Sequence, residues 1–219
     1  FECIRHGLGY PQMRHDEVVI ANLMHNFGQP LRDARTWAHM ACLSPGPMTK
    51  YGGQAIRYSM TAIFGAKCAE LALWNGFDPV CKMQMGPKTG DATRFETFEE
   101  FYQAWLEQQK FLNWQSIRGN DKFRYVNRRW FGRAMCSATF ERCVEAGENE
   151  SAPNEYGNNW LTNIAWNETS DILVGVKKLI YDEKKYTMSQ LLEALKANWE
   201  GYEEMRMDFV GAPKWGNDE

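Results

Sequence analysis

Cys42 is the first residue of this sequence whose surroundings point to chemistry. It follows the short apolar stretch Met40-Ala41 and precedes the turn-forming stretch Ser44-Pro45-Gly46-Pro47. Because two prolines around a glycine do not continue a helix or a central strand, we expect the thiol at the mouth of a turn. A rigid turn of this kind would hold the side chain in a fixed place at the tip of a loop.

Three interpretations of the Cys42 thiol are open. A small buried residue in a tight turn is the commonest fate of a free cysteine. A nucleophilic thiolate activated by His39 would require a helix that continues to Cys42 and a third group that orients the histidine. A thiyl radical that abstracts hydrogen atoms needs only a fixed position, a dry apolar pocket and a radical source. The surroundings of Cys42 fit this third role better than they fit ionic catalysis.

Arg57 is the second candidate. It follows Gly52-Gly53 and falls in the first turns of a predicted helix that is otherwise poor in charge. Most arginines in such places are exposed or ion-paired. The functional alternative is a guanidinium that binds a carboxylate through two parallel hydrogen bonds.

Other polar segments give weaker indications of function. Residues 118–133 interleave basic and aromatic side chains, a pattern that can bind single-stranded nucleic acid. The formal net charge of −3 and the lack of an RNA-binding motif favour a solvated or subunit-contact face instead. The stretch 86–91 resembles a phosphate-binding loop only superficially, because its glycine spacing is wrong and Pro87 lacks a backbone donor. Neither the histidines nor the six cysteines fall at metal-ligand spacing.

The composition favours a globular enzyme or binding domain. A chain of 219 residues with 44% hydrophobic content can bury a core within one domain. The charge argues against general binding to nucleic acid or anionic membranes. Since the sequence has no membrane-length apolar run and no signal-peptide pattern, we expect a soluble intracellular protein with reduced cysteines.

The predicted elements that position these residues alternate between helices and brief apolar stretches. Such alternation is typical of an α/β architecture. Capping-box patterns begin two of the helices, at Thr97 and at Thr187, and in the second Leu191, Leu195 and Trp199 should face one way. The predicted helices cover 16–27, 31–40, 54–74, 97–117, from 167 or 170 to 181, and from 187 to a stop at Gly201, with a strand at 160–166 and a loop at 77–96.

Several motifs along the chain resemble those of glycyl-radical enzymes, and they occur in the family's order. The stretch 40–47 resembles the cysteine loop of the branch that adds hydrocarbons to fumarate. The other matching stretches are 1–19, Lys50-Tyr51-Gly52, 75–79, 86–91, 177–179, 184–187, 198–202 and 212–218.

Within this family, the residues next to the cysteine separate the branches. Dehydratases and amine lyases are expected to place Glu two positions after it, where this sequence has Ser44. Pyruvate formate-lyase is expected to have paired cysteines, whereas Ala41 and Leu43 flank a single one here. Addition across a double bond moves no proton, so the reaction allows a missing carboxylate. The resemblance therefore implies addition of a hydrocarbon, toluene favoured, to fumarate, with benzylsuccinate as the product from toluene.

The same resemblance assigns roles to four residues. Cys42 carries the thiyl radical, Arg57 binds a fumarate carboxylate, Trp160 lines the fumarate site, and Ile164 faces the hydrocarbon. No cofactor or metal is expected in this segment. The resemblance implies a glycyl radical elsewhere in the polypeptide, installed by a radical-SAM activating enzyme. It also implies small accessory subunits and a homodimer of the large subunit.

The expected fold is part of the ten-stranded α/β barrel of glycyl-radical enzymes, rich in helix. We expect residues 1–219 to form a single partial segment of the catalytic barrel that lacks the glycyl-radical domain, and so to be inactive alone. The expected location is the cytoplasm of an anaerobic bacterium, at the first step of hydrocarbon degradation. Alternatives are an alkylsuccinate or naphthyl-2-methylsuccinate synthase, another glycyl-radical lyase or decarboxylase, and a non-catalytic interaction module.

Overall fold

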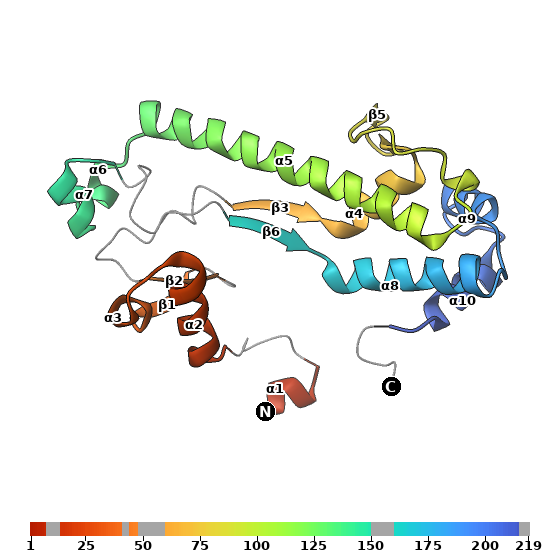
Figure 1. The fold of residues 1–219 in the computed structure, drawn as a ribbon, viewed down its shortest axis with the longest axis horizontal. Helices are drawn as coiled ribbons and strands as arrows, with labels where there is room; N and C mark the ends of the chain where they lie inside the picture. The colour runs from red at the N-terminus through yellow and green to blue at the C-terminus, as the bar shows by residue number, and fades with distance from the viewer. Residues whose placement is uncertain (8–13, 41–43, 48–59, 150–159, 215–219) are drawn as a thin grey trace. The chain divides into compact units, whose positions relative to one another are not determined.

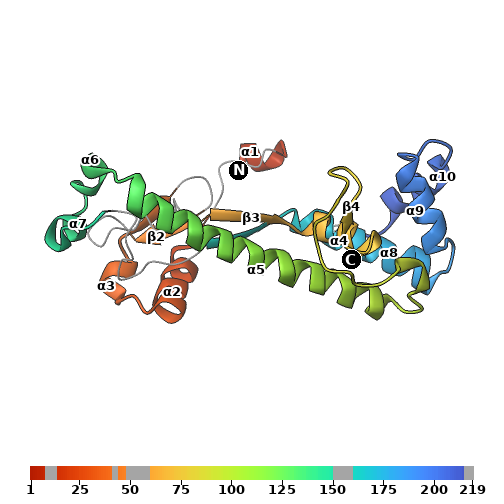
Figure 2. The same ribbon diagram turned by 90° about the horizontal axis from the view of Figure 1, so that it is seen from above.

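A computed structural model gives the fold of the chain (Figure 1, Figure 2). It describes residues 1–7, 14–40, 44–47, 60–149 and 160–214. The chain divides into two compact units. Unit 1 comprises Phe1–Met60 and Asn120–Trp160, and unit 2 comprises Thr61–Gly119 and Leu161–Glu219.

Unit 1 has a small hydrophobic cluster and a two-stranded hairpin. Val19, Leu23 and Ala34 are buried together, and Trp37 packs against them. The predicted glycine stop is confirmed, because Gly28 ends the second helix in a left-handed conformation with φ 65°. The elements of unit 1 are α1 (Glu2–Arg5), α2 (Asp16–Phe27), α3 (Leu31–Ala34), β1 (Trp37–Met40), β2 (Ser44–Pro47), α6 (Ala134–Ser137) and α7 (Glu141–Ala146).

The prediction of one helix over residues 31–40 is wrong. The helix α3 ends at Ala34, because the backbone N–H and the hydroxyl of Thr36 both donate to the carbonyl oxygen of Asp33, at 3.0 and 2.7 Å. The chain then enters the antiparallel hairpin β1–β2, in which Met40 pairs with Ser44. Pro45 is tolerated in a strand here because both strands of a two-stranded hairpin are edges.

Unit 2 contains the larger core. Its buried residues come from β3, α4, α5, α8, α9 and α10, and they include Cys68, Phe101, Trp105 and Val176. The elements are β3 (Met60–Phe64), α4 (Gly65–Leu73), β4 (Phe77–Asp78), β5 (Met83–Gln84), the 3-10 helix η2 (Ala92–Arg94), α5 (Phe98–Trp130), β6 (Trp160–Ile164), α8 (Trp166–Val176), the π-helix η3 (Lys177–Asp182), α9 (Met188–Lys196) and α10 (Glu203–Gly211). The helix α5 continues past Gly119 into unit 1.

Two strand–helix pairs position the centre of unit 2. The strands β3 and β6 are hydrogen-bonded neighbours although they are far apart in the sequence, and their arrows run side by side in the same direction (Figure 1). Each strand leads into a helix, β3 into α4 and β6 into α8. A Cβ at Gly65 would lie 2.4 Å from Oγ1 of Thr169, so glycine is needed where α4 passes α8.

The structure confirms several predicted elements and corrects others. Thr97 and Thr187 both form capping boxes, and residues 160–164 form a strand. The helix predicted over 54–74 begins only at Gly65, because residues 60–64 are a strand. The helix predicted to end at Ile117 continues to Trp130, since the basic and aromatic residues that follow are compatible with helix.

Candidate functional site

The β1–β2 hairpin carries the predicted radical cysteine. Residues 41–43 connect Met40 to Ser44, so Cys42 falls in the connection between the two strands by its place in the sequence. The stretch 44–47, which the sequence predicts to be a turn, is instead the strand β2. Cys42 itself and Arg57 lie outside the residues that the structure describes.

The strand β6 contains the other two predicted site residues. Trp160 is its first residue, and the Trp160 side chain lies outside the described part of the chain. Ile164 is the last residue of β6, and its side chain is 38% exposed. Ile164 is therefore available to contact a ligand on the face of β6 that it occupies.

The neighbouring strand β3 has one buried and one open face. Ile63 is 4% exposed and belongs to the core, whereas Ala62 and Phe64 on either side of it are exposed, Phe64 by 53%. This alternation is that of a strand with one face against helices. Like Ile164, Phe64 is the last residue of its strand.

The junction after β6 has an uncommon backbone conformation. Ala165 has φ 62°, a left-handed value that costs a residue with a side chain about 1 kcal/mol or more. Its carbonyl oxygen accepts a hydrogen bond from the Thr169 hydroxyl at 2.5 Å and another from the Thr169 N–H at 2.9 Å. These bonds fix the backbone at the junction between β6 and α8.

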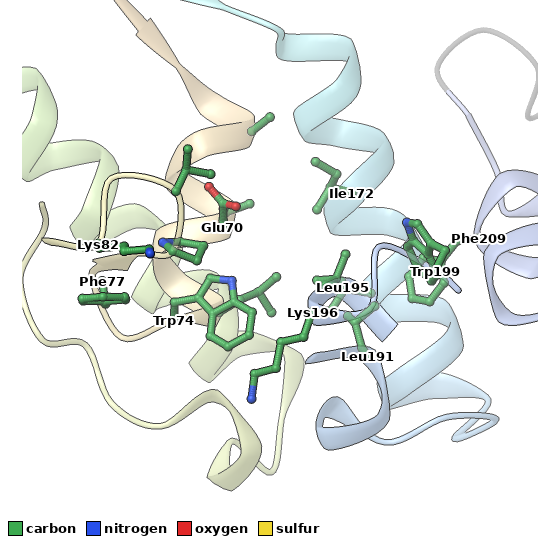
Figure 3. A pocket seen from close by; sticks show the side chains of 16 residues that line it. Glu70, Trp74, Phe77, Lys82, Ile172, Leu191, Leu195, Lys196, Trp199 and Phe209 are labelled. Atoms are coloured by element: carbon green, nitrogen blue, oxygen red, sulfur yellow. The ribbon is translucent and has the colours of Figure 1, made fainter. Parts of the chain in front are cut away.

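An apolar cavity of about 790 Å³ lies elsewhere in unit 2, among α4, the β4–β5 hairpin, α8, α9 and α10 (Figure 3). Leu191, Leu195 and Trp199 all line this cavity, as their predicted common direction requires. The predicted helix end at Gly201 is wrong, because α9 ends at Lys196 and Trp199 follows it. Lys196 lies over the Trp74 ring, with its Nζ 5.2 Å from the centroid. The lining contains neither a cysteine nor a residue of the predicted site. It can accept an apolar group, but its lining has no thiol to carry a radical.

A buried carboxylate fixes the hairpin beside this cavity. Asp78 is 1% exposed, and its Oδ1 accepts from the backbone N–H groups of Val80 and Cys81 at 2.8 and 3.0 Å. Its Oδ2 lies 2.9 Å from Nζ of Lys67, which also pairs with Glu70. The backbone N–H of Cys81, with the Lys67 ammonium, lowers the pKa of Asp78 to about 2. The carboxylate is therefore a structural anchor and unsuited to general acid–base work near neutral pH.

Cys68 is a thiol unsuited to thiolate chemistry. It is fully buried in the unit 2 core, and this burial raises its pKa to about 11. Among the described residues, no cluster of three or more His, Cys, Asp or Glu side chains could hold a metal ion. None of the described helices combines the length and apolar character that crossing a membrane requires.

Residues 1–219 all match one family, described as pyruvate formate lyase-like. The chain belongs to the pyruvate formate lyase-like family of glycyl-radical enzymes. The sequence resemblance to glycyl-radical enzymes is thereby confirmed, and its assignment to the fumarate-adding branch stays a prediction.

The pyruvate formate lyase-like chain has named relatives with several activities. It is 31% identical to trans-4-hydroxy-L-proline dehydratase of Clostridioides difficile over 222 residues, which cover 100% of the chain and 27% of the relative. It is 30% identical to isethionate sulfite-lyase of Oleidesulfovibrio alaskensis, covering 100% and 26%. The structure of a B12-independent glycerol dehydratase from Clostridium butyricum matches with a TM-score of 0.81 and 26% identity, covering 98% of this chain and 27% of that one. These relatives include no benzylsuccinate synthase.

The family match also settles the fold. The chain is a helix-rich part of the pyruvate formate lyase-like α/β barrel, as predicted. It spans about a quarter of the length of the relatives that it matches.

The exposed end of β3 was missed by sequence reasoning. The run Met60-Thr61-Ala62-Ile63-Phe64 was interpreted as helix because its residues also suit a helix interior. The available signal was Gly65 directly after a short apolar run, which is typical of a strand that ends where a helix packs closely.

Proposed function

We propose that the protein containing this chain adds a hydrocarbon to fumarate by a radical mechanism, as benzylsuccinate synthase does, with toluene the favoured substrate. The observation that carries the proposal is Ser44, the residue two positions after Cys42 and the first residue of β2. Dehydratases of the family are expected to have glutamate there. Elimination of water needs a group that transfers a proton, and addition to a double bond does not.

Cys42 performs the hydrogen transfers in this reaction. The radical is supplied by a backbone glycine outside residues 1–219, which a radical-SAM activating enzyme installs. The Cys42 thiyl removes one hydrogen atom from the toluene methyl group, and the S–H bond forms as the C–H bond breaks. The benzyl radical adds to the fumarate double bond. The resulting benzylsuccinyl radical then takes the hydrogen atom back from Cys42. A C–H bond forms as the S–H bond breaks, and the thiyl radical is restored.

The other predicted residues position the two substrates. Arg57 binds one carboxylate of fumarate through paired hydrogen bonds, and Trp160 forms a wall of the same subsite. Ile164 contacts the hydrocarbon, which has no polar group for recognition and must be held by apolar contact. The 38% exposure of Ile164 at the end of β6 supports this role. Accessory subunits and a second large subunit complete the proposed assembly.

A second candidate function is elimination by a lyase of the same family. The observation in its favour is 31% identity to a trans-4-hydroxy-L-proline dehydratase across the whole chain. In this case Ser44, or a residue outside residues 1–219, would have to move the proton. This alternative predicts that fumarate is not consumed.

The deciding experiment uses the full-length protein, activated under anaerobic conditions. Incubation with fumarate and methyl-deuterated toluene should give benzylsuccinate in which one deuterium has moved from the methyl carbon to the succinyl carbon. Parallel incubations contain trans-4-hydroxy-L-proline or isethionate. Turnover of either compound, with no consumption of fumarate by toluene, an alkane or 2-methylnaphthalene, would overturn the proposal in favour of the second candidate.

A further inference from the structure

We propose that Phe64, at the end of β3, forms the apolar wall of the substrate cavity together with Ile164 and sets the size of hydrocarbon accepted. Phe64 has no role in the residue assignments that the family resemblance provides. The identity of the ligand as a hydrocarbon rests on the proposed function. The placement of Phe64 rests on the geometry of unit 2 alone.

The two faces of β3 have different surroundings. Ile63 packs into the core with residues of α4 and α5, and it is 4% exposed. Successive side chains of a strand point to opposite faces, so Phe64 points away from that core. Its 53% exposure agrees with this direction. On this face the Phe64 ring is placed to bury its apolar area against an apolar molecule.

The neighbouring strand β6 also ends in an exposed apolar residue. β3 and β6 are hydrogen-bonded neighbours that run in the same direction, and Phe64 and Ile164 are the last residues of each (Figure 1). Both side chains are exposed although they belong to apolar residues. Two adjacent exposed strand ends can contact one small apolar molecule together.

Both residues lie at the carboxyl ends of their strands. In sheets whose parallel strands lead into helices, ligands bind at the carboxyl ends, where the loops and helix starts diverge. Both strands reach that edge here, because Gly65 begins α4 and Ala165 precedes α8. The left-handed Ala165, φ 62°, lies next to Ile164, and strained residues of this kind cluster at functional sites.

The alternative apolar location is the cavity lined by Trp74, Leu195 and Phe209. It lies among helices and the β4–β5 hairpin, and neither Phe64 nor Ile164 lines it. The two locations therefore predict different contacts for a bound hydrocarbon, and labelling can distinguish them.

The first test is photolabelling of the full-length protein with 3-phenyl-3-(trifluoromethyl)diazirine, an apolar probe close to toluene in size. Mass spectrometry should find the label on the peptides that contain Phe64 and Ile164, and an excess of toluene should suppress it. This readout needs neither fumarate nor turnover. Label confined to the peptide with Leu191 and Trp199, or not suppressed by toluene, would overturn the proposal. If fumarate is not consumed but the Phe64 label is suppressed, only the proposed reaction fails.

The second test is the size preference of variants. Phe64→Ala enlarges the cavity, so the ratio of kcat/KM for 2-methylnaphthalene to that for toluene should rise at least about tenfold, while the KM for fumarate stays constant. Phe64→Leu, which keeps most of the apolar volume, should give a smaller change and guards against misfolding. The matched control is Phe77→Ala, which removes a 40% exposed phenylalanine on β4 and should leave the ratio unchanged. An unchanged ratio in a folded Phe64→Ala protein would refute a specificity role.

Discussion

The β1–β2 hairpin and the core of unit 2 are held together by different interactions. The hairpin consists of two four-residue strands, and it is anchored through Trp37 to the small cluster of Val19, Leu23 and Ala34. The core of unit 2 combines buried residues from several helices and β3, with Phe101 among them. Among the described residues, the cluster in unit 1 has three buried members and the core of unit 2 has sixteen.

The two regions hold the two cysteines that the proposed function distinguishes. Cys68 lies in the core of unit 2, where burial raises its pKa. Cys42 follows β1 and precedes β2 in the sequence, and its role as the radical carrier is a proposal. Functional residues often lie in connections between the elements of a scaffold.

The largest expected effect is on activity and distinguishes these two cysteines. Cys42→Ala in the full-length protein should abolish product formation, because no other group can exchange the hydrogen atom. Its stability should remain close to that of the wild type. Cys68→Ala should retain the reaction chemistry but lower the local free energy of unfolding by about 1–2 kcal/mol. Product analysis and native-state hydrogen exchange measure the two effects, with the exposed Cys81→Ala as control.

If Cys42→Ala still formed product, the proposed difference in function between Cys42 and Cys68 would be refuted. The non-catalytic interpretation predicts that this substitution is silent in every assay. The same activated preparations should show a glycyl-radical signal in both the variant and the wild type, which confirms that activation succeeded.

The second effect concerns the two hydrophobic cores. Phe101→Ala removes a fully buried ring and should lower the free energy of unfolding of unit 2 by about 3–5 kcal/mol. Hydrogen exchange should accelerate in α4 and α8, which contribute to the same core. Trp114→Ala, on an exposed face of α5, should change the free energy of unfolding of unit 2 by less than about 0.5 kcal/mol. Acceleration confined to α5 would contradict a shared core.

The elements that the sequence predicts well have local signals. Thr97 and Thr187 cap helices through contacts within four residues, and Gly28 ends α2 by its own conformation. The strand β3 has only the glycine that follows it, Gly65, as a local signal. Its residues suit either a helix or a strand, and the choice depends on pairing with β6 far along the chain.

The same distinction applies to the candidate site. The turn that the Pro-Gly-Pro sequence predicts over residues 44–47 is wrong, because these residues form β2, paired with β1 along their whole length. Ile164 is 38% exposed at the end of β6, and the role that the family resemblance implies for it stays a prediction. Phe64 could not be placed beside it from the sequence, because that neighbour relation arises from tertiary pairing.

A smaller effect is expected where the loop 86–91 meets α5. A Cβ at Gly86 would lie 1.8 Å from Oε1 of Gln108, whose Nε2 donates to the Pro87 carbonyl at 2.8 Å and to the Thr89 hydroxyl at 3.0 Å. Gly86→Ala should displace this buried side chain and lower the free energy of unfolding by about 1–3 kcal/mol. Hydrogen exchange of α5 amides measures this loss of stability. Gly119→Ala, at an open helical position, should instead stabilise by about 0.5–1 kcal/mol. Equal effects from both substitutions would rule out the close contact.

The smallest expected effect is the pH dependence of unit 2. The pKa of Asp78 is lowered from 3.8 to about 2 in the folded chain. The carboxylate therefore stabilises the fold fully above about pH 4, and this contribution is lost as pH falls from about 4 towards 2. Hydrogen exchange of the β4–β5 amides between pH 5 and pH 2, corrected for intrinsic rates, should show the loss. Asp78→Asn should weaken this hairpin at pH 5 and should remove the pH dependence of its hydrogen exchange.

Lys67→Gln separates the two causes of this shift. It removes the ammonium 2.9 Å from Asp78 but keeps the backbone donors of Val80 and Cys81. Since the Cys81 N–H is the larger cause, the Lys67 variant should retain part of the pH dependence that Asp78→Asn removes. If Lys67→Gln removed the pH dependence of hydrogen exchange as completely as Asp78→Asn does, the ion pair would account for the whole lowering of the Asp78 pKa. The hairpin would then depend on charge attraction, and its stability should fall with added salt.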